Sequence, residues 1–115
     1  MDKYFEELPI AITVSDKEGN ILDMNAHSAN VNSKGVKIIG NNLYNCHPPH
    51  AAAILRDLYA NEKKNVYTIE KNGIKKLIYQ TPWYNNGVFA GLIEFSMEIP
   101  FDMPHYVRQP KPETK

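Results

Sequence analysis

The C-terminal half of the chain carries a period-two pattern that leaves few folds open. From residue 66 to residue 99, runs of alternating apolar and polar residues are separated by short polar turns. This alternation is typical of β-strands, whose successive side chains point to opposite faces. The turns Lys71-Asn72-Gly73 and Asn85-Asn86-Gly87 are hairpin signals. We therefore predict an antiparallel meander with strands at residues 66–70, 76–83 and 88–99.

One longer helix is predicted before this meander. Pro48 and Pro49 stop the preceding segment and suit the first turn of a helix, where a missing N–H costs no hydrogen bond. Residues 51–59 (AAAILRDLY) are strong helix formers, and Asn61 with the charged residues 62–64 ends them. Helical spacing places four apolar side chains on one face, namely Ile54, Leu55, Leu58 and Tyr59.

The N-terminal half supplies shorter elements. Residues 2–7 are expected to form a short helix that ends before Pro9. Residues 11–14 and 21–24 are apolar runs joined by a polar Gly-Asn turn, which predicts a hairpin. Residues 25–42 suggest short helices or loops. The two early strands are expected to be edge strands that complete a five-stranded antiparallel sheet, with the helices on one face, an α+β fold.

Length and composition favour one domain over residues 1–100, followed by a flexible, proline-rich tail over residues 101–115. Basic and acidic residues balance at 13 each, so the chain lacks the overall positive field that attracts nucleic acid or a membrane surface. A single cysteine, Cys46, excludes an intrachain disulfide and favours a reducing compartment. The polar N-terminus is unlike a secretory signal, so we expect a cytoplasmic protein.

Both ends of the predicted domain resemble the PAS family, over roughly residues 3–100. The opening segment LPIAITVSDKEGNILDMNAHSA is similar to the PAS entry strands and their turn, with Asp16, Gly19, Ile21 and Asn25 at the matching positions. The segment GVFAGLIEFSMEI resembles the PAS closing strand, with matches at Gly87, Gly91, Glu98 and Ile99. The stretch GNNLYNCHPPHAAAIL is similar to a bacterial and archaeal PAS subgroup with Cys-His-Pro-Pro before its long helix.

The resemblance implies a fold and a function. PAS domains are sensor or signal-transduction modules that hold a small ligand or cofactor between helix and sheet. They commonly pair through the N-terminal helix and the outer sheet face, so a homodimer or a partner signalling protein is expected here. Tyr4, Phe5 and Leu8 would supply an apolar stripe for that contact. A ligand-free adaptor that acts only in dimerisation or protein interaction is the alternative.

The segment Cys46-His47-Pro48-Pro49-His50 is the most unusual stretch. The resemblance implies heme as one candidate cofactor, with His47 or His50 as the iron ligand of a redox or gas sensor and with Cys46 or Met97 on the other side. Without heme, no metal site is predicted, His47 caps the helix and His50 faces solvent. A flavin is disfavoured because little beyond Asn45-Cys46 matches the light-sensing PAS branch.

The remaining candidates concern the pocket and catalysis. Tyr79 and Phe95 are predicted to form walls of the helix-to-sheet pocket. The residues Glu94 and Glu98 alternate with Phe95 and Met97, which predicts that both carboxylates face solvent. No pair of titratable residues is predicted to converge on a pocket, so we expect no enzymatic activity. Cys46 is interpreted as an inert thiol rather than a redox thiol.

Overall fold

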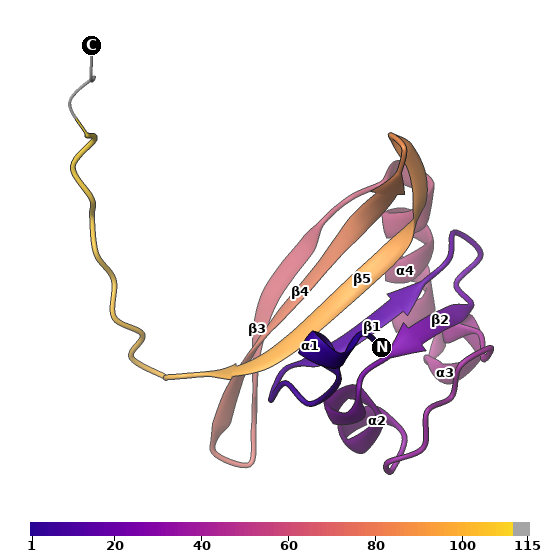
Figure 1. The fold of residues 1–115 in the computed structure, drawn as a ribbon, viewed down its shortest axis with the longest axis horizontal. Helices are drawn as coiled ribbons and strands as arrows, with labels where there is room; N and C mark the ends of the chain where they lie inside the picture. The colour runs from indigo at the N-terminus through magenta and orange to yellow at the C-terminus, as the bar shows by residue number, and fades with distance from the viewer. Residues whose placement is uncertain (112–115) are drawn as a thin grey trace.

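The computed structural model describes residues 1–111, except for the side chain of Cys46. A five-stranded antiparallel sheet with the order β2-β1-β5-β4-β3 forms the centre of the molecule (Figure 1). Its strands are β1 (Ala11–Ser15), β2 (Ile21–Met24), β3 (Asn65–Lys71), β4 (Ile74–Asn85) and β5 (Val88–Ile99). The helices are α1 (Lys3–Glu6), α2 (Ala26–Asn32), α3 (Leu43–Cys46) and α4 (Pro49–Asn61).

The predicted meander is confirmed, because β4 pairs with both β3 and β5 in antiparallel register. The position of β1 differs from the prediction. This strand lies inside the sheet, between β2 and β5, so that of the two early strands only β2 is an edge strand. Ala11 and Ile12 of β1 are buried. A short apolar strand gains most when partners satisfy its backbone on both sides.

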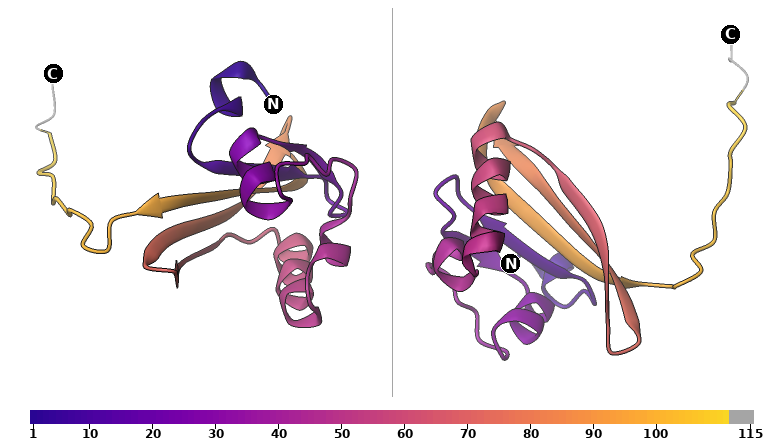
Figure 2. Two further views of the ribbon diagram at one scale, coloured as in Figure 1. Left: turned by 90° about the horizontal axis from the view of Figure 1, so that it is seen from below. Right: turned by 180° about the vertical axis from the view of Figure 1, so that it is seen from behind.

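The helices lie on both sides of the sheet (Figure 2), which differs from the prediction that they cover one face. Figure 2 (left) shows α4 below the sheet and α1 above it. We call the face covered by α3 and α4 the inner face, and the face beneath α1 the outer face. None of the helices in residues 1–111 is long and apolar enough to cross a membrane.

The predicted long helix is confirmed as α4, with Pro49 in its first turn. It ends where Glu62 adopts a left-handed conformation, and the Glu62 N–H bonds to the Leu58 carbonyl oxygen. The helix packs on the inner face through a cluster with Leu92 of β5. Ile54 departs from the prediction because it is 43% exposed at the margin of this contact. The buried α4 residues are Ala52, Leu55, Leu58 and Tyr59.

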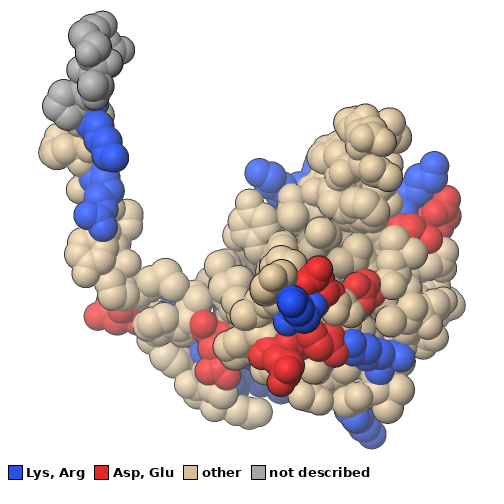
Figure 3. Space-filling view, viewed as in Figure 1, with Lys and Arg blue, Asp and Glu red and all other residues tan. Residues whose placement is uncertain are grey.

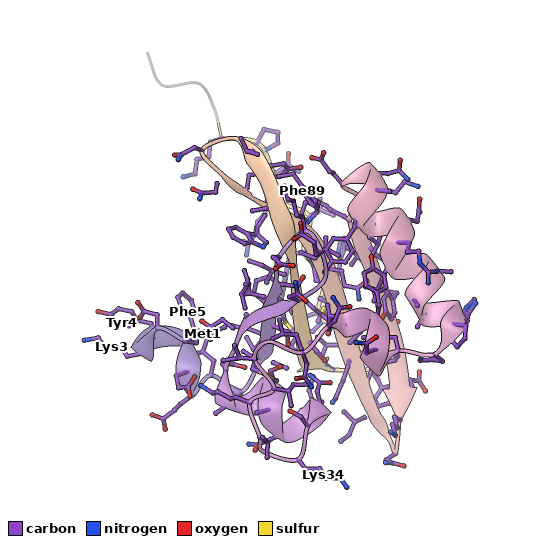
Figure 4. All side chains as sticks on the ribbon, turned by 90° about the vertical axis from the view of Figure 1, so that its right-hand side faces the viewer. Met1, Lys3, Tyr4, Phe5, Lys34 and Phe89 are labelled. Atoms are coloured by element: carbon purple, nitrogen blue, oxygen red, sulfur yellow. The ribbon has the colours of Figure 1, made fainter. Side chains whose placement is uncertain are left out.

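Gly91 of β5 allows this strand to lie close to the end of β1. A Cβ atom at this position would lie 1.9 Å from the backbone oxygen of Ser15, so only glycine fits. Next to it, Trp83 pairs with Gly91 whereas Tyr84 pairs with Phe89, which leaves Ala90 as an extra residue in β5. This bulge turns Phe89 toward the inner face, where it packs against the α4 cluster (Figure 4).

A buried asparagine joins the N-terminal elements. Asn25 is fully buried and caps α2, since its side-chain oxygen accepts from the Ser28 N–H at 3.0 Å and from the Ile12 N–H at 3.0 Å. Its amide nitrogen donates to the carbonyl oxygens of Phe5 and Ile10. One side chain therefore fixes α1, β1 and α2 relative to one another.

The chain leaves the sheet after β5. Residues 103–111 contain no helix or strand and are exposed, and they extend away from the sheet (Figure 1). The last part of the predicted tail, residues 112–115, lies outside the described residues.

Candidate ligand-binding site

A row of polar side chains crosses the inner face at the middle of the sheet. Thr13 of β1 lies opposite Glu94 of β5, Glu94 lies opposite Gln80 of β4, and Gln80 lies opposite Asn65 of β3. Residues directly opposite in register share one face of a sheet. We call these four residues the polar row.

Hydrogen bonds connect three members of the polar row. The Asn65 amide nitrogen donates to Gln80 Oε1 at 3.0 Å, and Gln80 Nε2 donates to Glu94 Oε1 at 2.8 Å. An ionised carboxylate only accepts hydrogen bonds, so Gln80 must turn its NH₂ group toward Glu94. That orientation leaves the Gln80 oxygen to accept from Asn65. The donor-to-acceptor direction of both hydrogen bonds therefore follows from the charge on Glu94.

The row continues on to α2. The hydroxyl oxygens of Thr13 and Ser28 lie 2.5 Å apart, and the Asn32 amide donates to Ser28 at 3.3 Å. Further along β1, Ser15 bonds to the Tyr59 hydroxyl of α4 and donates to the Leu92 carbonyl oxygen at 3.2 Å. The inner face thus carries hydrogen bonds where a simple amphipathic sheet would carry aliphatic contacts.

His47 faces the polar row from the helix side. It follows α3 directly, and its Nδ1 lies 2.7 Å from the Leu43 carbonyl oxygen. Because a carbonyl oxygen only accepts, Nδ1 carries a proton. In the neutral ring, the other ring nitrogen, Nε2, is an acceptor. The short helix α3 and the prolines after it hold the ring at this position.

Three adjoining hollows open between the helices and the inner face, and His47 and Glu94 line all three. The smallest has a volume of about 40 Å³ and also contacts Leu55 of α4 and Leu92 of β5. The other two measure about 240 Å³ and about 390 Å³. We call the three together the inner cleft. It is large enough for a small molecule.

The electrostatics of the inner cleft are one-sided. No lysine or arginine lines it, and among residues 1–111 no basic group forms an ion pair with Glu94. Burial raises the pKa of the Tyr59 phenol to about 12, and the Glu94 charge adds to this rise. Burial also raises the pKa of Tyr67, again with a contribution from Glu94. The Glu94 carboxylate is therefore one of the negative groups that act on both phenols.

The structure separates the residues that the sequence analysis grouped as a site. His47 lines the inner cleft, as a ligand site would require, whereas His50 is exposed in the first turn of α4. Cys46 belongs to α3, but its side chain lies outside the described part of the structure, so its predicted inertness stays a prediction. No group of metal-ligating residues is present among residues 1–111.

The predicted wall residues lie on the other face of the sheet. Tyr79 pairs with Phe95, and Phe95 lines an outer groove with Phe5 and Ile12. Met97 lies two residues further along β5, on the same face as Phe95. The prediction that Tyr79 and Phe95 form walls of the inner pocket is therefore wrong. Alternation shows which residues share a face, but not which face the helices cover.

The same reversal applies to Glu94, which was expected to face solvent and instead lines the inner cleft together with His47. The prediction that no pair of titratable residues converges on a pocket is therefore wrong. The sequence analysis also missed Thr13, Gln80 and Asn65. A signal was present, since Gln80 and Glu94 are long polar residues in the middle of apolar strands. Such positions are costly unless a partner or a ligand satisfies them.

Known structures share this architecture, although no protein-family model and no curated protein matches the sequence. The PAS domain of a protein from Colwellia psychrerythraea has a TM-score of 0.62 at 24% identity and covers 84% of this chain and 92% of its own. The PAS domain of Bordetella pertussis BvgS has a TM-score of 0.63 at 18% identity and covers 86% of this chain and 83% of its own. The PAS domain of histidine kinase ThkA has a TM-score of 0.62 at 17% identity and covers 78% of this chain and 99% of its own.

The protein therefore has the PAS fold. The predicted resemblance and the predicted five-stranded antiparallel sheet with helices are confirmed. The similarity to a Cys-His-Pro-Pro subgroup stays a prediction. At these identities the likeness concerns the fold, and what the cleft binds depends on its own side chains.

Proposed function

We propose that this PAS-fold domain is a non-enzymatic sensor module that holds a small ligand in the inner cleft. The observation that carries this proposal is the polar row beneath the helices. Fixing polar groups inside a sheet–helix contact is unfavourable unless they are hydrogen-bonded. Here they are bonded to one another on one side and open to a hollow on the other, as in a pocket that orients a ligand.

The geometry supplies a route for the signal. Leu55 of α4 belongs to the buried cluster and also lines the smallest hollow. A ligand in this hollow would contact the helix that packs on the sheet, and would favour the arrangement of α4 that accommodates it. The occupied and empty proteins would then differ in the position of α4.

The outer face supplies a candidate output surface. An apolar groove of about 300 Å³ runs beneath α1 and is lined mainly by Phe5, Ile12, Val14, Ile93 and Phe95. Figure 4 shows Tyr4 and Phe5 on α1, on the side of the sheet away from α4. Tyr4 is 72% exposed, and burial of such a side chain favours association. We expect a second copy or a partner signalling protein to cover this surface.

Heme fits the inner cleft poorly. His47 has one feature of an axial ligand, because its Nδ1 is fixed by a carbonyl oxygen. A macrocycle, however, would press a large apolar surface on the Glu94 carboxylate, which lines all three hollows, and on the Gln80 amide, which lines two of them. We therefore propose a smaller, polar ligand in place of heme.

The test is native mass spectrometry of the purified protein, together with its absorption spectrum. We expect a colourless protein with a bound small molecule. Ala51→Trp adds a large side chain to the cleft margin and should remove the bound mass. Ala53→Trp changes an exposed residue of the same helix and should leave it unchanged. Absence of any bound mass from the wild-type protein would instead support the ligand-free adaptor.

A further inference from the structure

We propose that the ligand of the inner cleft is a small cation, an amine or ammonium group on a short apolar body, recognised by Glu94 and His47. This inference rests on the proposed function, since it assumes that the cleft holds a ligand. It adds the charge and the hydrogen-bonding character of that ligand.

The charge of the cleft is the first argument. Glu94 is half-buried and is the one carboxylate among the residues that line the three hollows. Within residues 1–111 it has no cationic partner. A carboxylate partly removed from water attracts a cation more strongly than a surface carboxylate does. A ligand ammonium group would supply the missing counter-charge, whereas an anionic ligand would add repulsion.

The free hydrogen-bonding atoms agree with the charge. Gln80 uses Glu94 Oε1, and the described residues give Oε2 no partner. His47 uses Nδ1 on the Leu43 carbonyl oxygen, and in the neutral ring Nε2 is an acceptor. Both groups that border all three hollows therefore offer acceptors. An ammonium group carries only donors and matches both.

The remaining lining predicts the body of the ligand. The apolar part of the smallest hollow consists of Leu43, Leu55 and Leu92. The adjoining hollow adds Ile21, Met24 and Ile38. These side chains contact apolar groups without hydrogen-bonding them. A short alkyl chain behind the ammonium group would fit this part of the lining.

Glu94 has a structural alternative role, which is only to orient Gln80 and Asn65 across the sheet. That role predicts the same hydrogen bonds and some loss of stability when Glu94 is changed. It predicts no preference for the charge of a ligand. The charge preference is therefore the quantity to measure.

The experiment titrates the ¹⁵N-labelled protein with butylammonium, butanol and butyrate, which share a four-carbon body and differ in charge. The side-chain amide signals of Gln80 and Asn65 report on the cleft. We expect butylammonium to bind about tenfold more tightly than butanol, because a charge-assisted hydrogen bond replaces a neutral one. Butyrate should bind most weakly. This ranking needs no variant, so it does not depend on a mutant that folds.

Two variants assign the preference to one carboxylate. Glu94→Gln should make butylammonium and butanol bind alike. Glu98→Gln removes the same charge from an exposed position of the same strand and should leave the ranking unchanged.

Binding of butyrate as tight as that of butylammonium, or a ranking that persists in Glu94→Gln, would contradict the proposed cationic ligand. It would not contradict the proposal that the cleft binds a ligand. If none of the probes moved the cleft signals, the inference would also fail. Bound mass in the native spectrum would then decide separately whether the cleft holds another ligand.

Discussion

A sheet usually turns its apolar side chains toward the covering helices and its polar side chains outward. At the centre of this sheet the two faces have the opposite arrangement. The inner face, covered by α3 and α4, carries the polar row with Glu94 and Gln80. The outer face at the same level carries Ile12 and Phe95, which pair in register. In the view of Figure 3, charged side chains gather around α1, while the sheet above α1 is covered mainly by uncharged side chains.

The contrast shows that the covered face of this sheet is more than a core. Apolar burial is concentrated at one end of the inner face, around Leu92, and at β2 around Met24. Between these clusters the chain places hydrogen-bonding groups beside a hollow. On the outer face the apolar residues are covered only in part, by the four-residue helix α1. One face therefore presents polar groups beside a hollow, and the other presents a larger apolar surface.

The largest effect is expected at Gly91, which brings β5 close to β1 and lies beside the bulge that turns Phe89 inward. Gly91→Ala would place a Cβ atom 1.9 Å from the Ser15 backbone oxygen, so the strands must separate. We expect a loss of about 4 kcal/mol in the free energy of unfolding, measured by urea denaturation. Gly87→Ala meets no atom within 4 Å and should cost only about 1 kcal/mol for its positive φ. Equal effects at both glycines would contradict this account.

The next largest effect is expected at Asn25, which connects the outer helix α1 to the inner helix α2. Asn25→Ala removes four hydrogen bonds and leaves buried backbone groups without partners. We expect a loss of about 3 kcal/mol in thermal or chemical unfolding. Asn30→Ala, at an exposed position of the same helix, should change stability by less than about 0.5 kcal/mol. A small loss at Asn25 would mean that α1 is not held through this residue.

A pH titration would test the field of the inner face. The Tyr59 phenol ionises near pH 12 in the folded protein and near its ordinary pKa of 10 when unfolded. A raised pKa means that its contribution is complete below pH 10 and is lost as the pH rises to 12. We expect a loss of about 2 kcal/mol over this range, allowing for solvent screening.

Two variants separate the phenol from its hydrogen bond. Tyr59→Phe should cost about 1 kcal/mol at neutral pH and should lack the alkaline loss that the phenol causes. Ser15→Ala removes the same hydrogen bond but keeps the phenol, so the alkaline loss should persist. Denaturation curves at pH 8, 10 and 11 would compare them. An alkaline loss as large in Tyr59→Phe as in the wild type would exclude Tyr59 as its source.

The smallest effect is expected on the outer face. Phe5 is 48% exposed and lines the outer groove, so Phe5→Ala should lower stability by only about 1 kcal/mol. Its larger effect should be on association, measured by sedimentation over a range of protein concentrations. Lys34→Ala, at an exposed position away from α1, should change neither quantity. A sedimentation profile that Phe5→Ala leaves unchanged would argue against this groove as the contact surface.

The sequence alone determined the five strands, the first helix and the long helix, and most of the strand pairing. The turn signals at residues 71–73 and 85–87 predicted the meander, and β5 has the predicted bounds, Val88–Ile99. The prolines before Ala51 predicted the start of α4 within its first turn. These features are local, because turn residues, helix formers and alternation act over a few neighbouring positions.

Only the tertiary structure decided which face became the inner one. Alternation predicted that Tyr79 and Phe95 share a face and that Glu94 lies on the opposite one, and both statements hold. The choice between the faces depends on where α3 and α4 pack and on β1 lying beside β5. Those contacts join residues far apart in the chain, and a period of two has the same form whichever face they cover.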